Sequence, residues 1–437
     1  MAEFSCGTNN SQAISIGLNR FRTARHARSA ARLLLAAAGI ALSNELRRQR
    51  AGENSMKKRN AVSLSGLAIA ASAVCAPTAV HAQSSVTLYG VLDAGITYVS
   101  NAGGSHQVKF DDGISYGNRI GFKGVEDLGG GLQAIFVLES GFHLGNGQLG
   151  FGGAEFGRQA YVGLKNNWGT LSFGNQLDMT EEFAYLYNIS AWASGYAIHQ
   201  GDFDRMNGDR LPNSIKYLSN DISGFSFGGM YSFGNTAGDF HQKSAWSVGA
   251  RYEHGAFNMG AAYTQLNNPY GIYAFDPYAM IGTRTFLGQP TVSVDPATGA
   301  VTDLYSASAF PVDKQGAFAV GAAYTIGNVM LSGNFTYTTI KGLGQTSHMQ
   351  VYEGGASYTF TPALMLYGGY QHTRFEGNHW NQGSLGLHYL LSKRTDVYIS
   401  GDYLRASDGV NAVIGYSFTP SSTSTQADVR IGMRHSF

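Results

Sequence analysis

Basic side chains alternate with apolar ones in several segments of this 437-residue chain. Successive residues of a β-strand point to opposite faces, so Ile120 and Phe122 on one face place Arg119 on the other. The same count places Lys216 and Arg210 together on the polar face of a later strand. A guanidinium stays charged at neutral pH even where charges crowd together. A wall that carries such residues would pull anions toward it.

Acidic residues gather in one long segment, 177–210, together with aromatic side chains such as Phe183, Tyr185 and Trp192. An external solvated loop accounts for the acids, but not for so many apolar side chains. A loop packed inside a barrel needs them. We therefore expect the segment to fold inward. The acids expected to pull cations toward the path are Glu181, Glu182, Asp202 and Asp204.

The two ends of the region 83–437 show a two-faced pattern. In 428–437, Val429, Ile431 and Met433 share one parity and the charged residues share the other. In 84–99, Asp93 lies on the polar parity. The charged face would be the outside of a soluble sandwich, but it is the inside of a membrane barrel. In the barrel the protein encloses a water-filled channel.

The elements that must position these residues are short strands, so the chain is predicted to be all-β. No stretch of 18 or more apolar residues occurs in 83–437, which excludes a membrane-spanning helix there. The sixteen predicted strands are 84–99, 115–126, 131–143, 157–165, 169–176, 211–220, 224–233, 244–254, 255–266, 316–327, 328–340, 348–360, 362–374, 381–391, 394–405 and 426–437.

The connections between these segments alternate between short and long. Short turns on one side and longer loops on the other are typical of an antiparallel up-and-down membrane barrel. Sixteen strands enclose enough space for an aqueous channel. The longer loops are 100–114, 144–156, 177–210, 234–243, 267–315, 341–347, 375–380 and 406–425.

The folded part is expected to begin after a leader. Residues 56–82 have the basic start, the apolar centre and the small-residue end of a secretory signal peptide, with cleavage before Gln83. Residues 1–55 are either an upstream extension added by a misplaced start, with Met56 the true initiator, or part of a long bipartite signal or transit peptide; we favour the extension.

Removal of the leader changes the charge and the chemistry of the chain. Residues 1–82 hold 11 Lys and Arg and 3 Asp and Glu, which leaves 19 basic and 26 acidic residues and a net charge of −7. This balance argues against nucleic-acid binding. Both cysteines, Cys6 and Cys75, lie in the leader, so thiol chemistry is excluded from 83–437.

Several ordered motifs resemble those of the Gram-negative general diffusion porins, and the resemblance covers 83–437. The motifs are SSVTLYG at 84–90, NRIGFKGVEDLG at 118–129, GRQAYVGL at 157–164, NSIKY at 213–217 and the closing RHSF at 434–437. The resemblance implies a 16-stranded transmembrane β-barrel in the outer membrane, assembled as a homotrimer, with the third external loop folded inward. It places that loop at 177–210.

The resemblance also implies roles for particular residues. Arg119, Arg158 and Arg210 match a ladder of arginines on the barrel wall opposite the third loop; parity does not settle the face of Arg158. A C-terminal aromatic, here Phe437, is read by the outer-membrane insertion machinery. The pore-constriction residues predicted overall are Arg119, Arg158, Arg210, Lys216, Asp202, Asp204, Glu181, Glu182 and Asp93.

Two positions depart from the family pattern, since Val91 and Asn175 stand where relatives often carry basic residues. We therefore expect only modest ion selectivity, of either sign. Small hydrophilic solutes, outer-membrane lipid and lipopolysaccharide are the other expected partners. No cofactor or metal site is predicted.

Two other functions compete with passive diffusion, and a third would add to it. A substrate-specific channel on the same barrel is suggested by the aromatic residues of 177–210. An enzyme on a barrel would need Ser, His and an acid at one rim, and no such cluster stands out. A structural or adhesive role of 267–315 would add to transport rather than replace it.

Overall fold

The computed structural model describes residues 85–269 and 275–437. The predicted extension and signal peptide, 1–55 and 56–82, lie outside the described residues. No helix in the described ranges is long and apolar enough to cross a membrane.

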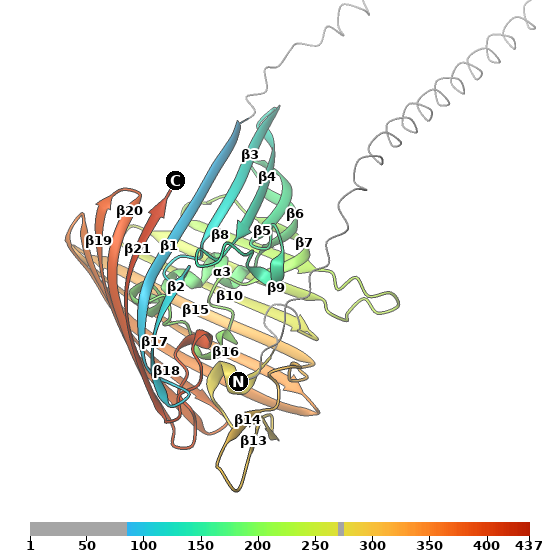
Figure 1. Ribbon diagram of the computed structural model, residues 1–437. Helices are drawn as coiled ribbons and strands as arrows, with labels where there is room; N and C mark the ends of the chain where they lie inside the picture. Colours follow the sequence, from blue (N-terminus) through green and yellow to red (C-terminus); the bar gives the residue numbers. More distant parts are fainter. Residues whose placement is uncertain (1–84, 270–274) are drawn as a thin grey trace, which may run out of the picture. The chain divides into compact units, whose positions relative to one another are not determined.

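One large antiparallel sheet dominates the described chain (Figure 1). Its strands are β1 (Ser85–Ala102), β2 (Ser105–Asp112), β3 (Arg119–Gly129), β4 (Leu132–Gly141), β5 (Gln159–Asn166), β6 (Gly169–Leu177), β7 (Arg210–Leu218), β8 (Phe225–Ser232), β9 (Ala245–His254), β10 (Phe257–Asn267), β15 (Lys314–Ile326), β16 (Val329–Gly342), β17 (Gln345–Thr361), β18 (Leu364–Phe375), β19 (Asn378–Ser392), β20 (Thr395–Ala406) and β21 (Thr425–Ser436).

The sheet closes on itself because β1 has partners on both sides. Its 91–99 stretch pairs with β21, so the first and last strands meet. On the other side, 85–91 pairs with β3 and 94–102 pairs with β2. Since β2 and β3 share one position beside β1, the sheet has sixteen positions. The prediction of a closed 16-stranded antiparallel barrel is confirmed.

The two faces of the sheet differ as the alternation predicted. In β21, Ile431 is 63% exposed, whereas Asp428 and Arg430 are 2% and 1% exposed. In β3, Ile120 and Phe122 are exposed. Apolar side chains therefore cover the outside, where a bilayer would meet them, and polar side chains fill the other face.

Two connections predicted as longer loops, 341–347 and 375–380, are tight turns, and a third, 100–114, forms the end of β1 and the whole of β2. The turn Gly103-Gly104 joins β1 to β2, and Leu343-Gly344 and Glu376-Gly377 join β16 to β17 and β18 to β19. Both residues of each turn have positive φ. Glycine adopts this conformation without strain, and such two-residue turns match the twist of the strands they join. The alternation of short and long connections is therefore less strict than predicted.

Short helices and hairpins lie in the connections β4–β5, β6–β7, β10–β15 and β20–β21. The helices are η1 (Phe151–Gly153), α3 (Met179–Phe183), η2 (Tyr185–Tyr187), α4 (Ile189–Ala193), η3 (Gln200–Asp202), α5 (Pro277–Ile281) and η4 (Gly415–Ser417), and the hairpin strands are β11 (Thr285–Phe286), β12 (Gln289–Pro290), β13 (Val292–Val294) and β14 (Val301–Asp303).

Candidate functional site

The connection between β6 and β7, which we call the helical segment (178–209), packs on the polar face of the sheet. Its helix α3 contacts β9 and β10, and α4 contacts β17, β18 and β19. The Met179 amide donates to Ser247 Oγ (3.0 Å) in β9. Farther along, Ser194 Oγ donates to Asp402 Oδ2 (2.5 Å) in β20. The segment is therefore attached to strands on widely separated parts of the sheet.

The two ends of the helical segment are tied to each other. Asp178 caps α3, since its Oδ1 accepts from the amides of Thr180 (3.0 Å) and Glu181 (3.1 Å). Its Oδ2 accepts from Arg205 Nε (2.6 Å), and Arg205 Nη1 lies 3.3 Å from Asp209 Oδ1. These ion pairs are buried, so removal of one partner would leave a costly unpaired charge.

A buried histidine clamps the middle of the segment to the wall. His199 Nδ1 lies 2.5 Å from Asp204 Oδ2, and its Nε2 lies 3.1 Å from Glu353 Oε2 in β17. Thr336 Oγ1 also donates to Asp204 Oδ2 (2.6 Å). Burial opposes the charge on the imidazole, but the two carboxylates outweigh it and raise the pKa of His199 to about 10.

Glycines form the surface of the wall on which the segment lies. A Cβ on Gly321 would stand 2.5 Å from Tyr187 Cβ, and one on Gly355 would stand 2.7 Å from Ile189 Cγ2. Cβ atoms on Gly260 and Gly386 would meet the backbone oxygens of Phe183 and Ala193. Only a residue without a side chain allows so close an approach. The glycines that make this track are Gly249, Gly260, Gly321, Gly355, Gly369 and Gly386.

The three predicted arginines line one cavity of about 500 Å³, which we call the arginine cavity. Arg119 comes from β3, Arg158 precedes β5, and Arg210 begins β7. Glu181 of α3 lines the same cavity, as does Asp112 at the end of β2. The fold therefore brings basic residues of the wall and an acid of the helical segment to one place.

The three arginines differ in what they contact. Arg158 Nε donates to Glu139 Oε1 (2.7 Å) in β4, a buried ion pair. Arg210 donates to the backbone oxygens of Arg158 and Gly208. Arg119 Nε donates to the Gly117 oxygen (2.9 Å), and within the described residues its side chain forms no ion pair.

Glu181 is an acid of the arginine cavity whose pKa lies near neutral pH. Its Oε2 accepts from the Gly208 amide (2.8 Å). Burial, followed by the nearby Asp178 carboxylate, raises the pKa of Glu181 to about 7. Its charge in the arginine cavity therefore changes near neutral pH.

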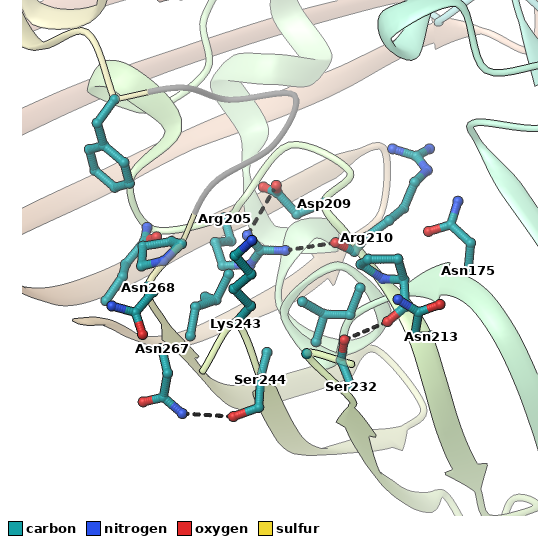
Figure 2. A pocket seen from close by; sticks show the side chains of 18 of the residues that line it. Asn175, Arg205, Asp209, Arg210, Asn213, Ser232, Lys243, Ser244, Asn267 and Asn268 are labelled. Carbon is teal, nitrogen blue, oxygen red and sulfur yellow. Dashed lines mark hydrogen bonds and ion pairs between the residues drawn. The ribbon is translucent and has the colours of Figure 1, made fainter. Parts of the chain in front are cut away.

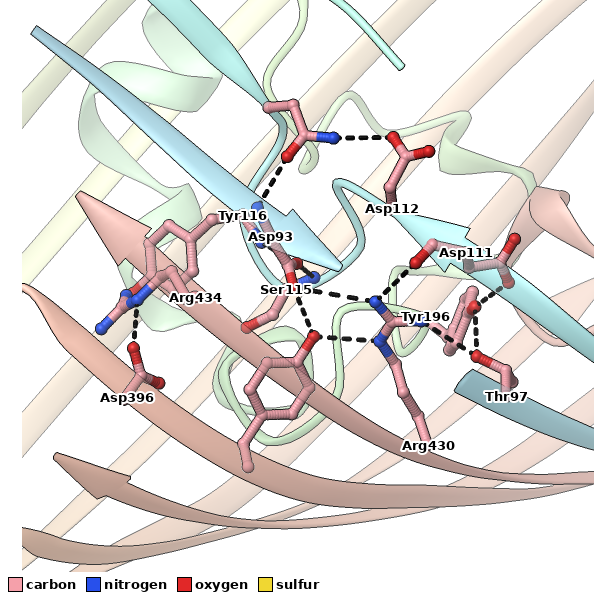
Figure 3. Close-up of polar contacts among 12 residues, drawn as sticks. Asp93, Thr97, Asp111, Asp112, Ser115, Tyr116, Tyr196, Asp396, Arg430 and Arg434 are labelled. Atoms are coloured by element: carbon pink, nitrogen blue, oxygen red, sulfur yellow. Dashed lines mark hydrogen bonds and ion pairs between the residues drawn. The ribbon is translucent and has the colours of Figure 1, made fainter. Parts of the chain in front are cut away.

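Aromatic rings complete the lining of the arginine cavity. Tyr185 and Trp192 of the helical segment lie 5.9 Å apart between ring centroids, and Tyr116 lies 6.5 Å from Trp192. Arg434 covers the Tyr116 ring at 4.1 Å from its centroid, and Figure 3 shows this contact beside Asp396. The rings form a continuous row of three.

A second cavity of about 370 Å³ lies beside β7–β10 and holds a predicted acid, Asp202. Figure 2 shows its polar lining, including Arg205, Asp209 and Arg210. Asp202 is 7% exposed. It therefore faces a different space from Glu181.

The other predicted site residues are held by hydrogen bonds or ion pairs to other parts of the fold. Asp93 is fully buried and accepts from the amides of Ser115 (2.6 Å) and Tyr116 (3.0 Å) and from Tyr398 Oη (2.6 Å), as Figure 3 shows in part. Lys216 Nζ donates to Glu182 Oε1 (2.5 Å). Asp204 is held by His199. None of these four predicted residues, Asp93, Glu182, Asp204 and Lys216, belongs to the described lining of the arginine cavity.

Comparison with known proteins decides the family. The chain matches the Gram-negative porin family over residues 66–409. This chain belongs to that family. An outer membrane porin protein of Bordetella pertussis is 32% identical over 406 residues, which cover 82% of this chain and 96% of the relative. The major outer membrane protein P.IB of Neisseria gonorrhoeae is 27% identical over 350 residues, 77% of this chain and 92% of the relative.

Solved structures share the fold of this porin. An anion-selective porin from Comamonas acidovorans superposes with a TM-score of 0.65 at 24% identity, covering 81% of this chain and 100% of that one. The trimer form of OmpT from Vibrio cholerae gives 0.58 at 16% identity, covering 81% and 99%. The porin is therefore an outer-membrane β-barrel channel for the passive diffusion of small hydrophilic solutes.

Sequence reasoning missed several residues of the porin's site. Glu139 has the polar parity of β4 beside Leu138, a signal that could have marked it as a partner of a wall arginine. His199 and Glu353 carry no local signal of their contact, because they are 154 residues apart. Tyr116 lies at a predicted strand start, and nothing in its spacing indicates the row of rings.

Proposed function

We propose that the narrow part of this porin's channel lies at the arginine cavity, between the wall arginines and the helical segment. The observation that carries the proposal is that Arg119, Arg158 and Arg210 share this cavity with Glu181. The contacts of the helical segment with the polar face support an inward position for it. Solutes would be sorted by size and by the field between these groups.

The charges of the site favour a modest anion preference. Arg158 is matched by Glu139, and Glu181 and Asp112 offset part of the remaining charge. Arg119, which has no ion-pair partner among the described residues, contributes most of the net attraction. The similar porin from Comamonas acidovorans is described as anion-selective, and a preference of the same sign is proposed for this chain.

Substitution of Arg119 tests the position of the narrow part. We expect Arg119→Glu to shift the zero-current potential in a salt gradient toward cations. The shift should be larger at 0.1 M than at 1 M salt, because charge is screened over about 10 Å at the lower concentration and about 3 Å at the higher. Lys341→Glu, at an exposed position of β16, is the control and should shift the potential far less. Equal shifts would place the narrow part elsewhere.

The proposal also covers the oligomeric state of the porin, the lipid around it and its insertion. We propose a homotrimer that sits among outer-membrane lipid and lipopolysaccharide and is inserted by the outer-membrane machinery through Phe437. We also propose that passage involves no chemical step. Hydrolysis of lipid or peptide by the purified porin, abolished by a substitution at one rim, would contradict this.

A further inference from the structure

The arginine cavity combines two kinds of surface that simple charge selection does not require. One is a guanidinium, Arg119, that forms no ion pair in the described chain. The other is the row of rings made by Tyr116, Trp192 and Tyr185. All four side chains are half-buried and line the same cavity.

The free guanidinium edge suits a carboxylate. Its planar donors match the two oxygens of a carboxylate better than they match a spherical ion such as chloride. Arg119 Nε is already used by the Gly117 oxygen. The two terminal nitrogens of Arg119 supply the donors that an incoming carboxylate would meet.

The row of rings suits a planar aromatic body. Aromatic rings attract one another in offset or edge-on arrangements beyond what their buried area provides. Tyr185 and Trp192 are tilted by 37° and Trp192 and Tyr116 by 66°, so the row presents both faces and edges. Arg434 covers the Tyr116 ring, which leaves Tyr185 and Trp192 as the rings offered to a solute.

The cavity is large enough for such a solute. Its volume of about 500 Å³ lies within the range of small-molecule sites. The two acids of the lining are already hydrogen-bonded within the protein: the Asp112 oxygens accept from Asn118 Nδ2 (2.6 Å) and the Gly145 amide (3.1 Å). Glu181 Oε2 accepts from the Gly208 amide.

We propose that the arginine cavity is a transit site for planar aromatic carboxylates, with Arg119 contacting the carboxylate and Tyr185 and Trp192 contacting the ring. The inference rests on the proposed function, because it assumes that solutes pass this cavity. It adds a substrate class that charge and size alone do not select.

Matched anions of equal charge test the proposal on the porin purified from outer membranes and placed in planar bilayers. Benzoate and cyclohexanecarboxylate differ mainly in the aromaticity of the ring. We expect wild-type porin to favour benzoate by about two- to tenfold in bi-ionic potentials, the range that aromatic pairing provides. A ratio of one in the wild type would overturn the proposal.

Variants locate the effect. Trp192→Leu should bring the benzoate ratio close to one, with each value normalised to the chloride permeability of the same variant. Tyr185→Leu provides a second measurement if the first variant fails to insert. Tyr403→Leu, 54% exposed on the outer wall, is the control and should keep the wild-type ratio. An unchanged ratio in the cavity variants would overturn the proposal.

Failure of this inference can be told apart from failure of the proposed function. If Arg119→Glu shifts the potential in potassium chloride while benzoate shows no preference, the narrow part stands and the aromatic site does not. If Arg119→Glu leaves the potential in potassium chloride unchanged, the narrow part lies elsewhere and both are overturned.

Discussion

The clamp made by His199, Asp204 and Glu353 should decide whether the helical segment stays on the wall. The change that isolates it is His199→Gln, which keeps a hydrogen-bonding side chain of similar length but removes the positive charge. Asp204 and Glu353 would then face each other across a neutral group while remaining buried.

The expected cost follows from the burial of the clamp. Both carboxylate side chains are no more than 1% exposed, and breaking a buried ion pair by removal of one partner costs about 3–5 kcal/mol. We take the lower end, because Thr336 Oγ1 (2.6 Å) and the Ser190 amide (2.6 Å) still donate to the two carboxylates. At about 1.36 kcal/mol for each factor of ten, a cost of about 3 kcal/mol shifts the docking of the segment by about two powers of ten.

Single-channel recording at pH 8 provides the assay. Detachment of the segment should appear as larger current fluctuations in the open channel, and the temperature at which the porin unfolds on a gel should fall. The effect should shrink at pH 5, because one of the buried carboxylates can then take up a proton and lose its uncompensated charge.

The wild-type clamp should lose its contribution only at a higher pH than the variant does. A raised pKa means that the folded state holds the proton more tightly, so its contribution is complete below the ordinary histidine pKa of about 6.5. It is lost as the pH rises through the raised pKa of His199, about 10. Wild-type currents should therefore stay quiet from pH 5 to pH 8.

A second buried histidine serves as the matched control. His388 Nδ1 lies 3.3 Å from Asp396 Oδ2, and Asp396 Oδ1 also accepts from Arg434 Nε (2.5 Å). These three residues belong to β19, β20 and β21, so the pair joins strands of the wall to one another. His388→Gln should leave the current fluctuations unchanged. If His199→Gln behaves like His388→Gln at pH 8, the clamp does not hold the segment and the reasoning fails.

Three further predictions concern the site, the closure of the barrel and its assembly. Because the pKa of Glu181 is raised to about 7, its carboxyl is neutral at pH 5 and charged at pH 9. The anion preference should therefore fall as the pH rises. If the zero-current potential of Glu181→Gln depends on pH in the same way, Glu181 is excluded as the cause. The Phe437 amide donates to the Gly90 oxygen and the Gly90 amide donates to the Phe437 oxygen (both 3.1 Å). Deletion of Phe437 should therefore reduce membrane insertion more than Phe437→Ala, which keeps this backbone pairing. Equal amounts of folded porin from both variants and from the wild type would rule out a role of Phe437 in barrel closure and in recognition by the insertion machinery. Unheated samples should migrate as trimers on gels, and a scattering mass of one chain in detergent would exclude the homotrimer.

Much of the fold could be predicted from the sequence, because a strand in a membrane barrel carries its information locally. The alternation of apolar and polar residues fixes which face each side chain takes. This was enough to place the barrel strands and the faces of Arg119 and Lys216. The tight turns at Leu343-Gly344 and Glu376-Gly377 were missed, since the flanking residues resemble loop residues as much as strand ends.

The arrangement of the site depends on contacts that no local pattern reports. Arg119, Arg158 and Arg210 were assigned by resemblance, but only the closed barrel brings them to a shared cavity with Glu181. The acids of the helical segment look equivalent in the sequence. In the structure Asp204 is held by His199, Glu182 contacts Lys216, and Asp202 lines another cavity.

The glycine track shows the same division between sequence and structure. Glycine is abundant, with 58 residues in the chain, and several glycines occupy turns. The sequence could not show that Gly260, Gly321 and Gly386 lie under one helical segment, because they come from β10, β15 and β19. The alternation of apolar and polar residues in the sequence determined the strands and faces of the barrel wall. Only the tertiary structure decided what packs against that wall, because those contacts join residues far apart in the chain.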